Sequence, residues 1–236
     1  MRRMTTPRDV PVLELREARP ALESEGLLSS AYDLRLMPGE CALIRSRDTV
    51  RAGLFADLCT GMVGLRDGSV RCQGLDWATM DERERWALRG RIGRVSQVGS
   101  WVDLFGTHFN ILTPVLHHTR IPTEQLIAEA TELAVRFGLP GLPVQAPGRL
   151  SPLDLRRAAL VRAFLGEPAL LILEDPVEVD MTDLLTPFLG MLTQARDQGA
   201  AVLWITRSAA LWGGYRDAAT SRYRLIDEGL FPMRGA

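Results

Sequence analysis

The sequence contains no lysine, so all 28 of its basic residues are arginine, balanced by 29 acidic residues. Chemistry that depends on a lysine amine is therefore excluded: Schiff-base formation, pyridoxal enzymes, a lysine general base and a lysine that cradles phosphate. The formal net charge is −1, and the arginines are scattered among Asp and Glu rather than clustered. A nucleic-acid partner needs a basic surface, so we expect none.

Cysteine and histidine are scarce, with three residues of each. The cysteines form no C-x-x-C pair and lie far from the histidines in sequence, so we predict reduced thiols and no zinc site. The adjacent pair His117 and His118 would not face one way on a helix, and no third ligand is near. We expect a loop or surface pair there. The other residues concerned are Cys41, Cys59, Cys72 and His108.

Long hydrophobic runs are also missing. No segment approaches the roughly 20 apolar residues that a membrane span needs, and the charged first residues have no apolar stretch behind them. We therefore expect a cytoplasmic protein, any membrane role of which comes through a partner.

Short apolar segments alternate with helical patterns along most of the chain. Buried strands are predicted at 41–44, 92–96, 170–173, 201–205 and 223–226, and helices at 124–137, 152–165 and 183–197, with Pro187 in the first turn of the last helix or bending it. This alternation predicts an α/β fold with a mainly parallel sheet and ligands at the carboxyl ends of its strands. Segments 12–15 and 32–36 alternate apolar with polar residues and predict antiparallel strands before that core. Between about 98 and 149 we predict a helical insertion without strands.

The stretch 150–176 is the most specific passage of the chain. A Leu-Ser pair opens a helix with spaced arginines, and a proline, four apolar residues, an acidic pair and a second proline follow. The residues in this order are Leu150, Ser151, Arg157, Arg162, Ala163, Pro168, Leu170 to Leu173 and Pro176. The order resembles the signature helix and Walker B strand of the ABC (ATP-binding cassette) ATPases. With further matches before and after it, the resemblance spans nearly the whole chain.

The resemblance implies a single P-loop NTPase-like domain with an antiparallel N-terminal β subdomain. Its core would be 12–97 and 166–236, and its inserted helical subdomain 98–165. It also implies ATP and Mg²⁺ as cofactors, a second ABC subunit in a homodimer or heterodimer, and an integral membrane permease as partner. The expected place is the inner face of the cell membrane. Residues 101–119 are faintly similar to the ATPases of MCE-type lipid-transport systems.

The phosphate loop implied by the resemblance falls on residues 46–53 and has lost its key residues. Ser46 and Arg51 replace the two glycines, Ala52 replaces the phosphate-binding lysine, and Gly53 replaces the hydroxyl residue that holds Mg²⁺. Arginines at 45, 47 and 51 either contact phosphate from the side or are solvated on the turn.

The other family positions are altered except one. Glu174 and Asp175 reverse the family's Asp-Glu order, so that the shorter carboxylate stands at the base position; alternatively they are simply two acids at a strand end. Arg207 replaces the switch histidine. Gln97 matches the glutamine that contacts magnesium and the γ-phosphate in the family, so the resemblance implies that role; it equally fits a hinge into the insertion.

The signature keeps Ser151 but has Pro-Leu-Asp where the family has Gly-Gly-Gln. Asp154 would face an anion, so we expect Ser151 to cap its helix, in capping-box form with Asp154, rather than bind phosphate. The position of the family's adenine-stacking aromatic holds Arg19, Pro20 and Ala21, so no stacking platform is evident.

A sequence that keeps its folding pattern but loses its site chemistry predicts a structural or regulatory pseudo-ATPase subunit. Two alternatives stay open: a working ATPase that uses arginines in the loop and Asp175 or Glu178 as base, and a soluble interaction protein with the cassette fold. An aromatic and aliphatic cluster in the insertion would anchor the membrane partner or pack the insertion's own core. That cluster is Trp101, Leu104, Phe105 and Phe109.

Overall fold

The computed structural model describes residues 9–21, 27, 30–97, 99–178, 181–215 and 218–233. The charged start of the chain and Val98, at the edge of the expected insertion, lie outside this range. The strands are β1 (Leu13–Pro20), β2 (Tyr32–Leu36), β3 (Cys41–Arg45), β4 (Leu65–Cys72), β5 (Leu75–Asp76), β6 (Ile92–Val95), β7 (Leu170–Glu174), β8 (Ala201–Thr206), β9 (Ser221–Ile226) and β10 (Gly229–Pro232). The helices are α1 (Thr49–Cys59), α2 (Glu82–Arg89), α3 (Thr107–His118), α4 (Thr123–Arg136), the 3₁₀ turn η1 (Pro147–Arg149), α5 (Pro152–Phe164), α6 (Thr182–Asp197) and α7 (Ala209–Gly214).

The strands form two sheets. The larger has the order β10-β9-β3-β8-β7-β6, parallel from β9 to β6, with β10 antiparallel at its edge. The smaller has the order β2-β1-β4-β5 and is antiparallel throughout. The predicted parallel core and N-terminal antiparallel subdomain are therefore confirmed.

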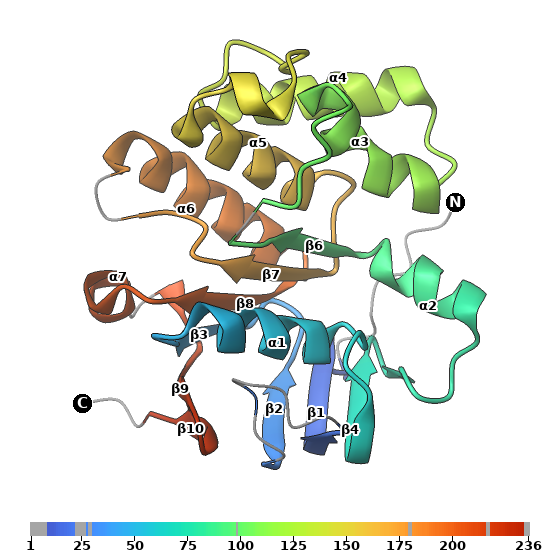
Figure 1. The fold of residues 1–236 in the computed structure, drawn as a ribbon, viewed down its shortest axis with the longest axis vertical. Coiled ribbons are helices and arrows are strands. Elements are labelled where there is room, and N and C mark those ends of the chain that lie inside the picture. The colour runs from blue at the N-terminus through green and yellow to red at the C-terminus, as the bar shows by residue number, and fades with distance from the viewer. Residues whose placement is uncertain are drawn as a thin grey trace.

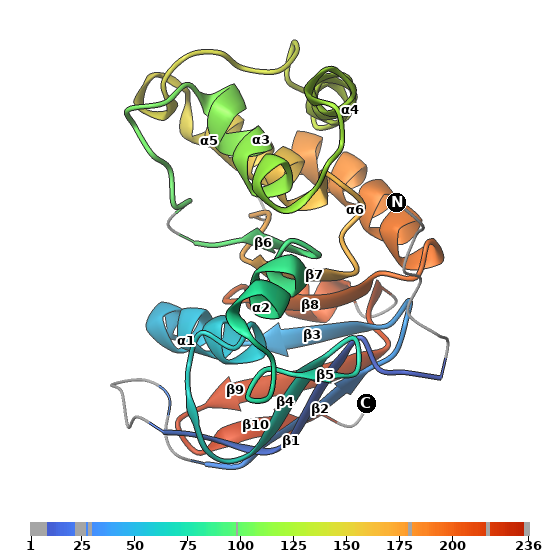
Figure 2. The ribbon, with the colours of Figure 1, turned by 90° about the vertical axis from the view of Figure 1, so that its right-hand side faces the viewer.

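The central strands β3, β7 and β8 are buried on both faces, as their continuous apolar runs predict. Side chains of alternating residues enter two cores on opposite faces of the larger sheet. Figures 1 and 2 show α3, α4 and α5 gathered on one side of that sheet and the smaller sheet on the other, with α1 between the two sheets.

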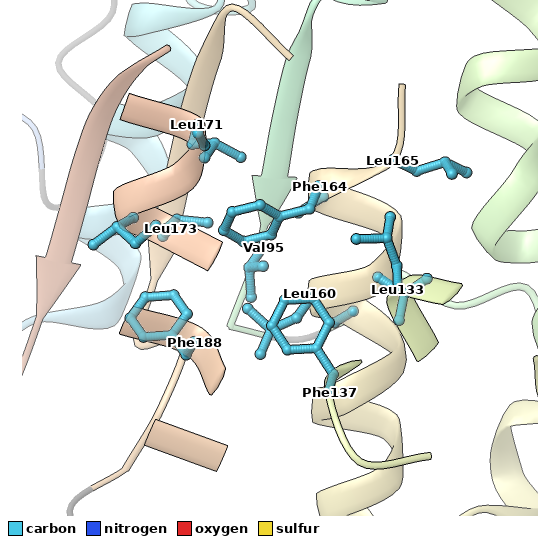
Figure 3. Close-up of a cluster of buried hydrophobic side chains, with 14 of the residues drawn as sticks. Val95, Leu133, Phe137, Leu160, Phe164, Leu165, Leu171, Leu173 and Phe188 are labelled. Atoms are coloured by element: carbon cyan, nitrogen blue, oxygen red, sulfur yellow. The ribbon is translucent and has the colours of Figure 1, made fainter. Parts of the chain in front are cut away.

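The helical side has an aromatic core. Figure 3 shows Val95, Leu171 and Leu173 of the larger sheet facing Leu160 and Phe164 of α5. The Phe164 ring also packs against that of Phe137, at the end of α4, with centroids 5.6 Å apart. This core fixes α5 over the sheet and so places the carboxyl ends of β6 and β7 relative to the helices.

Residues 99–149 contain helices and no strand, as predicted. Two local expectations were wrong in one of their two alternatives. Pro187 is the sixth residue of α6 and lies beyond its first turn, and the helix continues through it; the alternative, a bend at Pro187, stays a prediction. His117 and His118 end α3 rather than lying in a loop, whereas the surface alternative fits His117, which is exposed; the two rings lie 4.8 Å apart.

Within the described residues, no three His, Cys, Asp or Glu side chains converge as a metal site would require. The same part of the chain has no helix of the length and apolarity that crossing a bilayer demands. All three cysteines are free and buried.

Candidate functional site

The loop between β3 and α1 lies at the carboxyl ends of the parallel strands, where the sequence places the phosphate loop. Its polar groups form hydrogen bonds within the loop and with the start of α1. Asp48 is the N-cap of α1, and its carboxylate accepts the N–H groups of Val50 at 2.8 Å and Arg51 at 3.1 Å. These hydrogen bonds, chiefly that from Arg51, lower the pKa of Asp48. N–H groups at a helix N-terminus have no partner within the helix and can bind an anion. Here two of them are hydrogen-bonded to a carboxylate of the chain itself.

Ser46 stabilises the same turn through two hydrogen bonds. It is 1% exposed, its hydroxyl donates to the Asp48 carbonyl at 2.9 Å, and its N–H donates to the Thr206 carbonyl at 3.1 Å. The last bond joins the loop to the end of β8. Ser46 therefore acts as a turn residue that is hydrogen-bonded to the loop and to β8.

Arg51 corrects the expectation made for the loop arginines. Its side chain is only 12% exposed and pairs with Asp48, at 3.5 Å, and with Asp227 in the turn between β9 and β10. It is therefore neither solvated nor directed at an open loop, because two carboxylates hold its guanidinium. Arg47, by contrast, is exposed, as the solvated alternative predicts.

The next two loop positions face the core and the acidic pair. Ala52 is 6% exposed and packs in the apolar core beside the smaller sheet. Gly53 lies close to Glu174: a Cβ added at Gly53 would stand 3.6 Å from Glu174 Oε2. The structure thus brings positions 53 and 174 together, as the resemblance implies for the residues that hold Mg²⁺.

Glu174, at the end of β7, is bonded to an arginine that sequence reasoning missed. Arg94 of β6 donates from Nε to Glu174 Oε1 at 2.8 Å and from Nη1 to Asp57 Oδ1 of α1. Glu174 is 4% exposed, and burial raises the pKa of its carboxyl although the Arg94 charge opposes the shift. A signal was present in the sequence: Arg94 is a charged residue in a short strand that otherwise reads as buried.

Asp175 is the most fully bonded polar group of the site. One oxygen accepts from Gln97 Nε2 at 2.8 Å and Arg207 Nε at 2.6 Å. The other accepts from the Arg207 N–H at 2.9 Å and the Thr206 hydroxyl at 3.2 Å. The predicted residues Gln97, Asp175 and Arg207 are therefore brought together, and the unchanged glutamine is bonded to the carboxylate. All four donors belong to the chain itself, and one of them is a guanidinium.

The backbone at Asp175 is held in an uncommon conformation. Its φ is +43°, in the left-handed region that a residue with a Cβ rarely adopts. The Asp175 N–H donates to the Ile205 carbonyl at 2.9 Å, which fixes this conformation against β8. Such strain persists only where the surroundings impose it, so the position of this carboxylate is tightly determined.

Ser151 lies apart from these groups, at the N-terminus of α5. It caps the helix, as predicted, by accepting the Asp154 N–H at 3.1 Å. Only half of the expected capping box forms, because the Asp154 carboxylate accepts from the Ser151 hydroxyl at 2.9 Å and from Arg157 at 3.1 Å. The N-terminus of α5, like that of α1, therefore has a carboxylate of the chain itself beside its first turn.

Residues 19–21 continue the smaller sheet instead of forming a stacking surface. Arg19 and Pro20 end β1 opposite Asp67 and Leu65 of β4, and the Ala21 N–H donates to the Gly64 carbonyl at 2.8 Å. No aromatic side chain stands at these three positions.

The apolar cluster of the insertion is divided between core and surface. Trp101 packs against the helical core, with the Arg162 guanidinium 4.4 Å above its ring. Leu104 is 86% exposed, and Phe105 and Phe109, with ring centroids 5.2 Å apart, are each 45% exposed. Leu104, Phe105 and Phe109 are called the exposed apolar face below. The alternative of packing in the insertion's own core therefore holds for Trp101, which is partly buried against it. That the exposed apolar face anchors a membrane partner stays a prediction.

Comparison with known proteins gives a consistent result. No family model matches the chain. It is 32% identical over 186 residues to the lipoprotein-releasing system ATP-binding protein LolD of Maricaulis maris, covering 76% of this chain and 79% of that protein. It is 26% identical over 221 residues to LolD 1 of Rhodopirellula baltica, covering 93% and 94%. It is also 28% identical over 145 residues to the intermembrane phospholipid transport system ATP-binding protein MlaF of Haemophilus influenzae, covering 61% and 54%.

Solved structures agree on the fold. The dimeric structure of the bacterial ABC transporter cassette MJ0796 superposes with a TM-score of 0.80 at 17% identity, covering 95% of this chain and all of that one. The same cassette in a post-hydrolysis state bound to ADP and Pi gives a TM-score of 0.79 at 16% identity, with the same coverage. These likenesses confirm the predicted α/β cassette architecture with its antiparallel and helical parts.

Proposed function

Because the chain belongs to the ATP-binding subunits of ABC transporters, we propose that it is a transporter subunit whose own half of the nucleotide site no longer hydrolyses ATP. Subunits of this family pair with membrane permeases and dimerise, as the dimeric MJ0796 cassette illustrates. The proposed unit is one cassette domain, with core 12–97 and 166–236 and helical insertion 98–165. It acts structurally or regulatorily, as a pseudo-ATPase on the inner face of the cell membrane.

The observation that carries the proposal is the bonding of the α1 N-terminus. Triphosphate binding by a strand-loop-helix turn needs free backbone N–H groups and a cation directed at the phosphates. Here the Val50 and Arg51 amides bond to Asp48, and the Arg51 guanidinium is engaged by two carboxylates. A phosphate arriving at this turn would meet the negative charge of Asp48 and would have to displace it.

The hydrolytic side supports the same proposal. A general base must accept a proton from water, yet both oxygens of Asp175 already accept two hydrogen bonds each. Turning Asp175 towards a substrate would require breaking its pair with Arg207. Glu178, the alternative base, is exposed.

The exposed apolar face supports a membrane partner. Leu104, Phe105 and Phe109 stand on the insertion and at the start of α3. Aromatic and aliphatic anchors of this kind are typical of interface centres. By their names, LolD is the ATP-binding protein of a lipoprotein-releasing system and MlaF that of an intermembrane phospholipid transport system, which favours a lipid or lipid-anchored substrate for the transporter of this chain.

Steady-state ATP turnover of the purified protein, alone and with its permease, tests the loss of hydrolysis. We expect turnover equal to that of the Asp175→Asn variant. Turnover that Asp175→Asn abolishes would establish the working ATPase instead.

Co-purification of the chain with an integral membrane permease from its own cells tests the membrane assignment. Leu104→Asp with Phe109→Asp should release the chain from the permease. The matched control is Val135→Asp on α4, also an exposed apolar position, at 57% exposure. A chain that fractionates without any membrane protein would favour the soluble interaction protein.

A further inference from the structure

Three oxygen atoms from two elements converge on the guanidinium of Arg94. It donates to the Glu174 carboxylate of β7 at 2.8 Å, to the Asp57 carboxylate of α1, and more weakly to the Gly53 carbonyl at 3.4 Å. The side chains of Glu174 and Asp57 are 5% and 36% exposed, and that of Arg94 is 28% exposed. The guanidinium therefore lies between α1 and β7, largely shielded from water.

Two carboxylates and a backbone carbonyl are hard oxygen donors of the kind that bind Mg²⁺ or Mn²⁺. In this chain the donors do not fit such an ion, because an arginine already engages all three. A divalent cation at the same oxygens would stand within a few ångströms of the guanidinium, in a poorly solvated place where like charges repel strongly. The ion would have to expel Arg94 and leave its charge without partners.

We propose that Arg94 is a built-in cation, which permanently takes the place of a divalent metal ion between Asp57 and Glu174. The inference deepens the proposed pseudo-ATPase function and rests on it. In this chain's half of the nucleotide site, its own side chains stand in for the ligands. Arg94 supplies the positive charge in place of the metal ion, and Asp48, at the start of α1, supplies the negative charge in place of the phosphate.

The arrangement also explains how an acid at the family's metal position can stay buried. A carboxylate as enclosed as Glu174 needs a cation or a proton. The guanidinium of Arg94 supplies that cation, because arginine is always charged in proteins. Through its bonds to Asp57 and Glu174, Arg94 joins α1, β6 and β7.

Manganese binding without nucleotide tests this inference directly. Mn²⁺ is followed by its electron paramagnetic resonance signal and by the melting temperature. We expect no saturable Mn²⁺ response from the natural protein. Arg94→Ala should lower the melting temperature and create a saturable Mn²⁺ site that restores part of the loss. Adding Glu174→Gln to Arg94→Ala should remove that site.

The matched control is Arg89→Ala. Arg89 is also half-buried, but its guanidinium donates to the carbonyls of Thr60 and Gly61 and not to a carboxylate. Its loss should therefore create no Mn²⁺ response. Arg94→Lys, which keeps a positive charge, should fold and bind no Mn²⁺. It takes the place of Arg94→Ala as the test variant if Arg94→Ala does not fold.

Saturable Mn²⁺ binding by the natural protein that Glu174→Gln removes would overturn the inference and leave the proposed loss of hydrolysis standing. A folded Arg94→Ala variant without any Mn²⁺ response would also overturn it. ATP turnover by a natural protein that binds no Mn²⁺ in the absence of nucleotide would instead contradict the proposed function.

Discussion

Replacing Asp48 by alanine removes the N-cap of α1 and frees the two amides that the carboxylate accepts. Loss of an N-cap of this type costs about 1 kcal/mol, within a range of roughly 0.5–2 kcal/mol. The ion pair with Arg51 adds little, because it is 3.5 Å long and the Asp48 side chain is 39% exposed. For a protein of this size, about 1 kcal/mol corresponds to a melting temperature lower by roughly 2–4 °C.

The assay is thermal unfolding followed by circular dichroism, with and without sulfate. Asp81→Ala is the matched control, since Asp81 caps α2 by the same kind of bond but lies outside the loop. Both variants should lose similar stability. Sulfate should stabilise Asp48→Ala more, because the first turn of α1 has no acidic residue whereas that of α2 contains Glu82 and Glu84.

The effect of pH provides a second readout. The folded-state pKa of Asp48 is lowered, so the stability it contributes is fully present above its unfolded pKa of about 3.9 and is lost as pH falls through the folded pKa. The gap between the natural protein and Asp48→Ala should therefore close in acid. Two results would refute the assignment of Asp48 as an internal anion. One is an Asp48→Ala variant as stable as the natural protein at pH 7, and the other is equal stabilisation of Asp48→Ala and Asp81→Ala by sulfate.

Three other outcomes follow from buried groups. Because the folded-state pKa of Glu174 is raised, its contribution to stability falls as pH rises from the unfolded pKa of about 4.3 through the folded pKa. Urea unfolding of Glu174→Gln should therefore show a smaller fall in stability over this pH range. A pH dependence equal to that of the natural protein would contradict this. Burial raises the pKa of Cys41 and Cys72 to about 12 and that of Cys59 further, so a thiol reagent such as DTNB at pH 8 should label none of them before unfolding; rapid labelling of the native protein would show the burial to be wrong. Asp175→Asn should cost about 1–3 kcal/mol, and a double-mutant cycle with Arg207→Ala should show coupling; additive effects would exclude their pairing.

The larger sheet could be predicted from the sequence because β3, β7 and β8 are buried on both faces and read as uninterrupted apolar runs. The segments that were not predicted are mostly exposed. β4 has a polar, half-exposed pattern, and α2 buries only Leu88. The capping box formed by Asp81 and Glu84 was a usable signal for α2.

At the site, the spacing of the family motifs was enough to predict that Gln97, Asp175 and Arg207 lie together, and these three residues are hydrogen-bonded to one another through Asp175. It could not supply partners that come from elsewhere in the fold. Arg94 reaches Asp57 and Glu174 across separate elements, and Arg51 reaches Asp227 in a distant turn. For that reason Arg51 was wrongly expected to be solvated or to contact phosphate, and the internal charges of the loop became visible only in three dimensions.

Equilibrium binding of Mg-ATP to the isolated chain, measured by isothermal titration calorimetry, tests the central claim most directly. A phosphate loop bonded to Asp48 and a metal position filled by Arg94 predict no saturable heat of binding. One Mg-ATP bound per chain with micromolar affinity would contradict the account.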